Sequence, residues 1–256
     1  MTGKRVSDSW EEFLSRGGVY FPKDVDRGFF SDILSSRWVV SLLKDGSRKK
    51  FLSAGCGLGR FAIAIAAAGR DVALMDCSEE SLNAARLLGE IAKRHFGDIS
   101  IRFLKDDLER TSFADGEFDV TFNEGVVEHW LDRGERIKVI KEMARITRDG
   151  GVVSIRVINN KNPLYNLIYK KALREDVPAH HRYDMRELKA EMEDAGLDPV
   201  LWDGETINDP DEYSANKLLI KTLRIAALAI NTAPKFVREA FCPSIFCTAI
   251  VRRTRP

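Results

Sequence analysis

Cysteines, prolines and long apolar runs are all scarce in this sequence of 256 residues. Its four cysteines form no C-x-x-C pair, so we expect reduced thiols packed as small apolar groups, without disulfides and without a metal site. No apolar run reaches the length that spans a membrane, and no N-terminal segment has the charged-then-apolar pattern of a signal peptide. These absences together predict a cytoplasmic protein.

An excess of charge of either sign is also missing. The 40 Lys and Arg residues balance the 39 Asp and Glu residues to a formal net charge of +1. Such a chain has no overall field that would gather nucleic acid, and we expect no nucleic-acid partner. Its length favours one domain with additions, long enough to bury a substantial core.

The most informative stretch runs from residue 50 to residue 76. A short apolar run is followed by a turn containing three glycines, a helix of small residues and a second apolar run that ends at Asp76. This is the pattern of a βαβ unit. Glycines let a ligand approach the backbone of the turn, and a strand-end carboxylate can accept hydrogen bonds from both hydroxyls of a ribose. The stretch therefore predicts nucleoside binding.

The spacing of the glycines discriminates between nucleosides. Gly55, Gly57 and Gly59 give G-x-G-x-G, whereas a dinucleotide fingerprint places its third glycine one residue later, where this chain has Arg60. No Walker-type G-K-[ST] sequence is present. A nicotinamide oxidoreductase thus becomes the poorer alternative.

G-x-G-x-G after a strand resembles the first motif of the class I S-adenosylmethionine-dependent methyltransferases, of the small-molecule methyltransferase-11-like type. Two later stretches, KDDLERTSFADGEFDVTFNEGVVEH and MARITRDGGVVSIRV, are similar to that family's later motifs and follow in the same order. The resemblance covers about 51–157. It implies an α/β, Rossmann-like, doubly wound seven-stranded sheet that is mostly parallel, with the last strand antiparallel and helical additions at both ends.

The resemblance also implies S-adenosylmethionine as the cofactor and a set of residues around it. Asp76 would hold the ribose, Asp107 the adenine amino group (with Asp106 as the neighbouring alternative), and Asn123 the methionine part. The family usually has an acid where this chain has Ser53, and Glu124 is the candidate to compensate. The full expected set is Ser53, Gly55, Cys56, Gly57, Gly59, Asp76, Cys77, Asp107, Leu108, Asn123 and Glu124.

Methyl transfer needs a base only when the acceptor must lose a proton. His129, just past the fourth predicted strand, and His181, on a later loop, are the candidates. The alternatives are that His129 orients its loop and that His181 belongs to a solvated pair with His180. The residues after Asn123 lack the motifs that the family uses for amide or nucleobase nitrogens and for cytosine C5, which leaves a small-molecule acceptor at oxygen, nitrogen or carbon.

Helical patterns flank the predicted core. We expect helices over 9–14 and 26–43, so that 1–45 forms an N-terminal helical cap, with Tyr20 and Phe21 as candidates for a lid. The methyltransferase domain would then cover 46–256. Helical insertions are predicted near 159–184 and 208–243 within that domain. Strands are predicted at 51–52, 72–75, 99–104, 118–122, 152–158, 199–207 and 245–252. Helices are predicted between them at 61–68, 79–92, 137–146 and 185–195.

Two further alternatives stay open at this point. Ser53 and the absence of an assured base motivate a catalytically silent, cofactor-binding or regulatory module. The apolar helical stretch 216–230 could pack on the domain, pair with a second copy, or rest on a membrane to collect a quinone-like or lipid acceptor. Monomer and homodimer are both consistent with the sequence.

Overall fold

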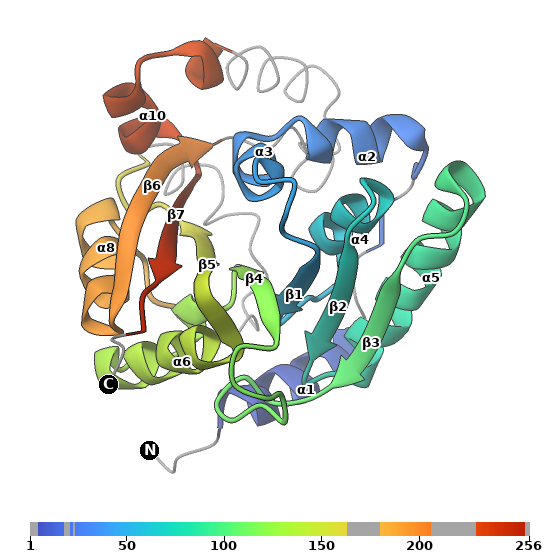
Figure 1. Cartoon of the computed structure of the whole chain (residues 1–256), viewed down its shortest axis with the longest axis horizontal. Helices are drawn as coiled ribbons and strands as arrows, with labels where there is room; N and C mark the ends of the chain where they lie inside the picture. The colour runs from blue at the N-terminus through green and yellow to red at the C-terminus, as the bar shows by residue number, and fades with distance from the viewer. Residues whose placement is uncertain (1–4, 18–20, 23, 163–179, 206–228, 254–256) are drawn as a thin grey trace.

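A computed structural model describes residues 5–17, 21–22, 24–162, 180–205 and 229–253. In this part of the chain, seven strands form one sheet in the order β3-β2-β1-β4-β5-β7-β6 (Figure 1). β7 is antiparallel to both of its neighbours, and the pairs among β1 to β5 are all parallel. The predicted sheet is confirmed. Its strands are β1 (Lys50–Ala54), β2 (Asp71–Asp76), β3 (Ile101–Lys105), β4 (Phe118–Glu124), β5 (Thr147–Ile158), β6 (Leu197–Glu205) and β7 (Ser244–Val251).

Helices cover both faces of the sheet because successive strand residues point to opposite faces. Phe51 packs into one apolar cluster, and its neighbour Leu52 packs into the other. The first cluster includes residues of α2 (Arg27–Leu34), α3 (Arg37–Leu43), α4 (Arg60–Ala67) and α5 (Glu79–Phe96). The second includes residues of α6 (Arg133–Ile146) and α8 (Met185–Asp194), and α10 (Lys235–Phe241) packs beside β6.

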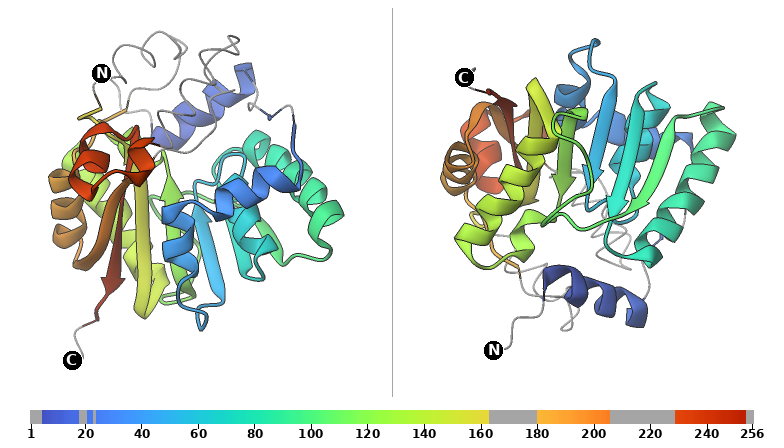
Figure 2. Two further views of the ribbon diagram at one scale, coloured as in Figure 1. Left: turned by 90° about the horizontal axis from the view of Figure 1, so that it is seen from above. Right: turned by 60° about the horizontal axis from the view of Figure 1, so that its bottom comes forward.

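The chain changes direction across the sheet between β1 and β4. From β1 it proceeds outward to β2 and β3, then returns to place β4 on the other side of β1. Such a switch point leaves a crevice beyond the carboxyl ends of the strands, where ligands of α/β sheets bind. α1 (Val6–Gly17) lies across this end of the sheet, below β1 to β4 in Figure 1 and in the right-hand view of Figure 2.

Two predicted elements differ from the structure. The helix expected over 26–43 is wrong as one unit, because Ser36 is extended and its hydroxyl caps α3 by accepting from the Val39 N–H. The strand expected from residue 152 begins earlier, at Thr147, whose partner in the sheet is Phe118. Gly151 lies in this early part of β5, close to β4. A Cβ at this position would lie only 2.8 Å from the Asp119 carbonyl oxygen of β4, so a glycine is needed there.

Several predictions fall outside the described residues. These are most of the helical insertion expected near 159–184, the lid candidate Tyr20 and almost all of the apolar stretch 216–230. Within the described ranges, no helix is both long enough and apolar enough to cross a membrane.

Candidate functional site

A cavity of about 340 Å³ opens at the switch point, between the carboxyl ends of the parallel strands and α1. Its volume is within the range of small-molecule and cofactor sites. Among the described residues, its charged lining consists of four carboxylates and one guanidinium, those of Asp76, Asp106, Asp107, Glu124 and Arg60. The site is therefore suited to a ligand with cationic and hydrogen-bond-donating groups.

The glycine turn forms the floor of the cavity. Gly55, Gly57 and Gly59 all have positive φ angles, of 72°, 52° and 75°, which other residues adopt at a cost. A Cβ at Gly59 would lie 2.4 Å from a Leu74 methyl carbon, so this glycine lets α4 approach β2 closely. A Cβ at Gly57 would meet nothing within 4 Å, which leaves room for a ligand against the backbone.

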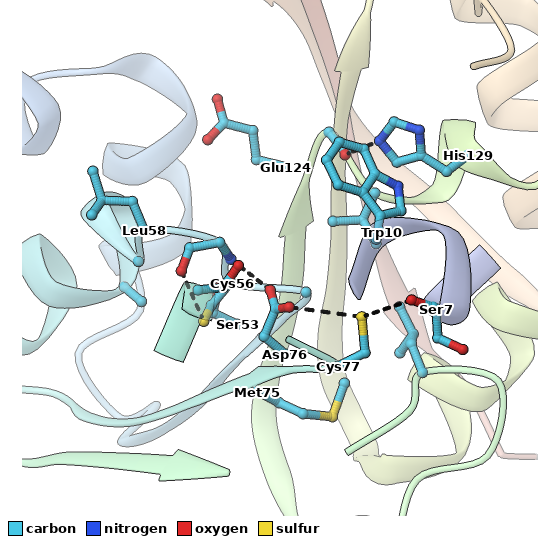
Figure 3. Close-up of a pocket in the computed structure, with 18 of the residues that line it drawn as sticks. Ser7, Trp10, Ser53, Cys56, Leu58, Met75, Asp76, Cys77, Glu124 and His129 are labelled. Atoms are coloured by element: carbon cyan, nitrogen blue, oxygen red, sulfur yellow. Dashed lines mark hydrogen bonds between the residues drawn. The ribbon is translucent and has the colours of Figure 1, made fainter. Parts of the chain in front are cut away.

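Asp76 ends β2 directly beside this turn. Its carboxylate accepts the Gly57 N–H at 2.8 Å and the Ser78 N–H at 3.0 Å, so it orders both the glycine turn and the start of α5. Burial raises the pKa of Asp76, and the two N–H donors oppose that shift. The pKa of Cys77 is raised to about 12, mainly by burial and then by the Asp76 charge, so this thiol stays protonated. Figure 3 shows Cys77 between Asp76 and Ser7.

Two neighbouring acids follow β3, and their hydrogen bonds separate them. Asp106 is saturated by its own loop, since it accepts from the Ser112 N–H and hydroxyl and from the Asp107 N–H. Asp107 accepts the Glu109 N–H with one oxygen, and its other oxygen accepts the hydroxyl of Ser7 on α1 at 3.0 Å and lies 3.5 Å from the Arg5 guanidinium. Asp107 is thus the acid whose second oxygen is held by a group from a separate element, one that a ligand could replace. Leu108 also lines the cavity.

An ion-pair group occupies the β4 end of the cavity. Glu124 accepts from Arg60 at 3.3 Å and from the buried Arg156 of β5. Arg60 and Glu124 both line the cavity, as does Ser53 at the end of β1. Ser53 itself brings no charge. The nearest charges at this end are therefore a carboxylate and a guanidinium, placed side by side.

Two predicted site residues are not brought to the cavity. The side chain of Asn123 is fully buried, and its amide donates to the sulfur of Met143 on α6. His181 lies before α8 and its Nε2 is 2.7 Å from a carboxylate oxygen of Glu187. Neither residue contributes to the cavity lining.

His129 does line the cavity. It lies at the end of the 3₁₀ turn η1 (Val127–His129), and its Nε2 is 2.9 Å from the Gly125 carbonyl oxygen. A carbonyl only accepts, so Nε2 carries the hydrogen, and Nδ1 is the basic nitrogen of the neutral ring. The ring packs edge-on against Trp10 of α1, with centroids 4.6 Å apart (Figure 3).

Trp10, Ser7 and Arg60 are site residues that the sequence reasoning missed. Trp10 lies in the helix expected over 9–14 and forms part of the cavity wall, although only Tyr20 and Phe21 were predicted to lie over the site. Arg60 stood out only as the position of a missing glycine. Its place as the first residue of α4, immediately after the glycine turn, is the signal that could have indicated a role in the site.

These features fit S-adenosylmethionine. A strand-end acid and the open backbone at Gly57 suit an adenosyl group, and Asp107 suits an amino group at its edge. The paired Glu124 and Arg60 are complementary to the ammonium and carboxylate of a methionine end. Four carboxylates around one guanidinium also suit a sulfonium cation.

The fold and the site define a class: a nucleoside-binding, doubly wound α/β domain of the methyltransferase type. Residues 52–155 match the methyltransferase domain family. The matched residues 52–155 are thus identified as a methyltransferase domain, and S-adenosylmethionine is the cofactor of that class.

Individual relatives agree with this assignment. The malonyl-[acyl-carrier protein] O-methyltransferase of Pectobacterium atrosepticum is 33% identical over 124 residues, which are 48% of this chain and 44% of that protein. The match therefore spans less than half of that relative. The ubiquinone biosynthesis O-methyltransferase of Bordetella avium is 27% identical over 175 residues, 65% of this chain and 69% of that protein.

A solved structure shows the same fold. Magnesium protoporphyrin IX methyltransferase from Synechocystis PCC 6803, with bound S-adenosylhomocysteine, aligns with a TM-score of 0.58 at 17% identity. The alignment covers 96% of this chain and 94% of that one.

Proposed function

We propose that this protein transfers the methyl group of S-adenosylmethionine to a small-molecule acceptor at oxygen, nitrogen or carbon. The observation that carries the proposal is the cavity at the switch point, where the glycine turn, Asp76 and Asp107 surround one space. Both curated relatives are O-methyltransferases, which favours oxygen as the atom methylated.

The residues have distinct roles in this proposal. Asp76 accepts the ribose hydroxyls, Asp107 and the Leu108 N–H bind the adenine edge, and the glycine turn with Cys56 and Cys77 packs against the adenosyl group. Ser53, Glu124 and the β4 end around Asn123 hold the methionine part. The bound cofactor supplies a methyl group already activated by the sulfonium. What the protein must add is alignment of the acceptor and exclusion of water.

The acceptor would enter beside His129 and Trp10. Both side chains line the cavity on the side of β4, where an acceptor could reach the methyl group in line with its bond to sulfur. His129 lines this wall, and its proposed role is either to accept a proton through Nδ1 or to provide a packing surface through its ring. His181 is not carried into this role because it pairs with Glu187, outside the cavity lining.

The wider setting is also proposed. Residues 1–45 would act as a helical cap on the methyltransferase domain at 46–256, and the contacts of Ser7 and Trp10 support this role for α1. The protein would work in the cytoplasm as a monomer or homodimer, with no nucleic-acid partner. A peripheral membrane contact through the stretch 216–230 would suit a lipophilic acceptor.

One observation favours a second candidate. Ser53 offers no charge to the cofactor's ammonium, and Glu124 is shared by two arginines. A site weakened in this way could bind S-adenosylmethionine without turnover and serve as a regulatory module.

Calorimetric titration with S-adenosylmethionine and, in parallel, with NADH tests the cofactor. We expect micromolar binding of S-adenosylmethionine and none of NADH. Formation of S-adenosylhomocysteine with a panel of phenols, carboxylic acids and amines then separates the enzyme from the silent module. Binding without turnover across the panel would favour the module, and absence of binding would refute both.

A further inference from the structure

Glu128, in the 3₁₀ turn η1, is a carboxyl group without an evident structural purpose. Its side chain is buried, at 1% exposure, and neither oxygen has a hydrogen-bond partner among the described residues. Only its backbone is engaged, since its carbonyl oxygen accepts the His181 N–H at 2.6 Å. Leaving a buried polar group unpaired costs stability, so such a group calls for an explanation beyond folding.

The carboxyl lies immediately behind the cavity wall. Gly125, Val126, His129 and Trp130, which surround Glu128 in sequence, all line the cavity. Gly125 has a φ of 67° and no side chain, and a Cβ placed there would have one neighbour within 4 Å, the Oε1 atom of Glu128 at 3.9 Å. The carboxyl itself is enclosed, and at Gly125 only backbone, with no side chain, separates it from the cavity.

Charged groups face Glu128 from each neighbouring strand and loop. Burial, with a smaller contribution from the charge of Glu124 on β4, raises the pKa of Glu128 to about 8. Arg156 on β5 and the N–H groups of Glu128 and Ile158 act in the opposite direction, without forming a normal hydrogen bond to either oxygen. Tyr183, before α8, interacts with the same carboxyl, and burial raises its own pKa, so it remains a neutral phenol.

Building on the methyltransferase function proposed above, we propose that Glu128 takes the proton from a phenolic hydroxyl of the acceptor. As the acceptor oxygen attacks, the O–H bond breaks and its proton passes to a carboxylate oxygen of Glu128. The oxygen forms a bond to the methyl carbon, and the electron pair of the carbon–sulfur bond stays on sulfur. The products are the aryl methyl ether, S-adenosylhomocysteine and protonated Glu128.

The chemistry of the group selects this acceptor class. A base is most effective when its pKa lies near the working pH and close to that of the proton donor. A phenol, with a pKa of about 10, is within reach of Glu128, whereas an ordinary carboxylate is a much weaker base. A carboxylic acid acceptor has already lost its proton at neutral pH, and its charge would be repelled by ionised Glu128. An aliphatic alcohol holds its proton too tightly for this group to remove it.

His129 has a different part in the same turn. Its Nε2 holds the Gly125 carbonyl, and its ring packs on Trp10. These contacts fix the backbone of Gly125, past which Glu128 would reach the acceptor. His129 is accordingly a positioning residue, and Glu128 is the group that would take the proton by reaching the hydroxyl past Gly125.

The test uses three probes that carry different oxygens on one ring: catechol, benzyl alcohol and benzoate. Wild type is compared with Glu128→Gln, which keeps the shape of the side chain but cannot take up the proton. Glu205→Gln is the matched control: Glu205 is also buried with its pKa raised by burial, but its carboxylate accepts the backbone N–H groups of Arg37 and Trp38 and does not lie behind Gly125. Turnover, affinity for S-adenosylmethionine and the infrared C=O band of a protonated carboxyl are measured for each protein.

We expect wild type to methylate catechol in preference to the other two probes, with a kcat that rises through about pH 8. Glu128→Gln should lose about 10²- to 10⁴-fold in kcat, together with this pH limb and the infrared band at neutral pH. It should keep the affinity for S-adenosylmethionine, and Glu205→Gln should keep its catechol turnover.

Three results would overturn the proposal: equal turnover of catechol by Glu128→Gln, a preference of wild type for benzoate or benzyl alcohol, or failure of wild type to bind or methylate catechol while it binds S-adenosylmethionine. Failure of wild type to bind S-adenosylmethionine would instead refute the proposed function. If Glu128→Gln did not fold, Glu128→Asp, which retracts the carboxyl by one methylene, should keep the infrared band and still lose kcat. Full activity of that variant would count against the proposal.

Discussion

At the scale of single residues, Asp76 is the side chain that links folding of the cofactor turn to binding. We expect Asp76→Ala to weaken the affinity for S-adenosylmethionine about 10- to 100-fold, the loss typical of a hydrogen bond to a charged group. Asp71→Ala is the control. Asp71 begins the same strand but at its opposite end, where it accepts the Ser100 hydroxyl. Calorimetry measures the affinity of both variants for S-adenosylmethionine. An equal loss of affinity in Asp71→Ala would mean that the loss comes from damage to β2 and not from removal of the Asp76 carboxylate.

Glu128 gives a prediction about stability that does not depend on any ligand. Its pKa in the folded protein, about 8, lies above its ordinary value of 4.5. The stabilisation that comes with the proton is therefore complete below pH 4.5 and is lost as the pH rises through 8. Glu128→Gln cannot lose this stabilisation, because its amide does not titrate. The unfolding free energy of the variant minus that of wild type should therefore increase between pH 5 and pH 8, by at most about 1.4 kcal/mol per pH unit.

The contribution of Glu142 to the unfolding free energy should depend on pH in the opposite direction. Arg145 and Thr111 donate to this carboxylate and outweigh its partial burial, so its pKa lies below the ordinary value. Its contribution to stability is present above pH 4.5 and is lost as the pH falls. Urea unfolding of Glu142→Gln should thus show its largest deficit relative to wild type at neutral pH. A flat difference for Glu128→Gln in the same experiment would contradict the high pKa of Glu128.

At the scale of elements, α1 is a wall of the cavity joined to the rest of the domain by a few side-chain contacts. It is held by the Ser7 to Asp107 hydrogen bond, by a Glu11 to Lys105 ion pair at 2.7 Å and by Trp10 against His129. An aromatic pair of this kind is worth about 0.5–1.5 kcal/mol. We expect Trp10→Ala to speed release of S-adenosylhomocysteine about 2- to 10-fold in stopped-flow measurements. Leu87→Ala, at an exposed position of α5, should leave the rate unchanged.

The elements also show where sequence reasoning succeeds. β1, β2, β4 and the later part of β5 were predictable because buried parallel strands are mostly apolar runs between turn residues. Asp76 and the three glycines were predictable because the chain itself places them in one βαβ unit. Trp10 and Arg156 were not, since their contacts join segments far apart in sequence. The break at Ser36 was missed because one serine within an amphipathic pattern is compatible with either a helix interior or a cap.

At the scale of the whole molecule, one buried ion pair ties the parallel part of the fold to its antiparallel edge. Arg136 of α6 and Glu191 of α8 are both buried, and their side chains are 2.6 Å apart. Glu191 also accepts the Tyr183 hydroxyl at 2.6 Å, and Arg136 donates to the Leu131 carbonyl. Because α6 connects β4 to β5 and α8 precedes β6, the pair fixes how the last two strands are added to the sheet.

Removing Glu191 leaves the buried Arg136 with only a longer contact to Glu187, at 3.5 Å, and with backbone carbonyls as partners. Glu191→Ala should therefore lower the unfolding free energy by about 3–5 kcal/mol, whereas Glu90→Ala, from the exposed pair with Lys93, should change it by less than about 1 kcal/mol. The double variant Arg136→Met with Glu191→Leu should be more stable than Glu191→Ala, since no isolated charge remains. Urea titrations of these variants measure the change in unfolding free energy.

Since neither Arg136 nor Glu191 lines the cavity, any Glu191→Ala protein that stays folded should bind S-adenosylmethionine with the affinity of wild type. Loss of binding in the folded variant would mean that the antiparallel edge also shapes the cofactor site.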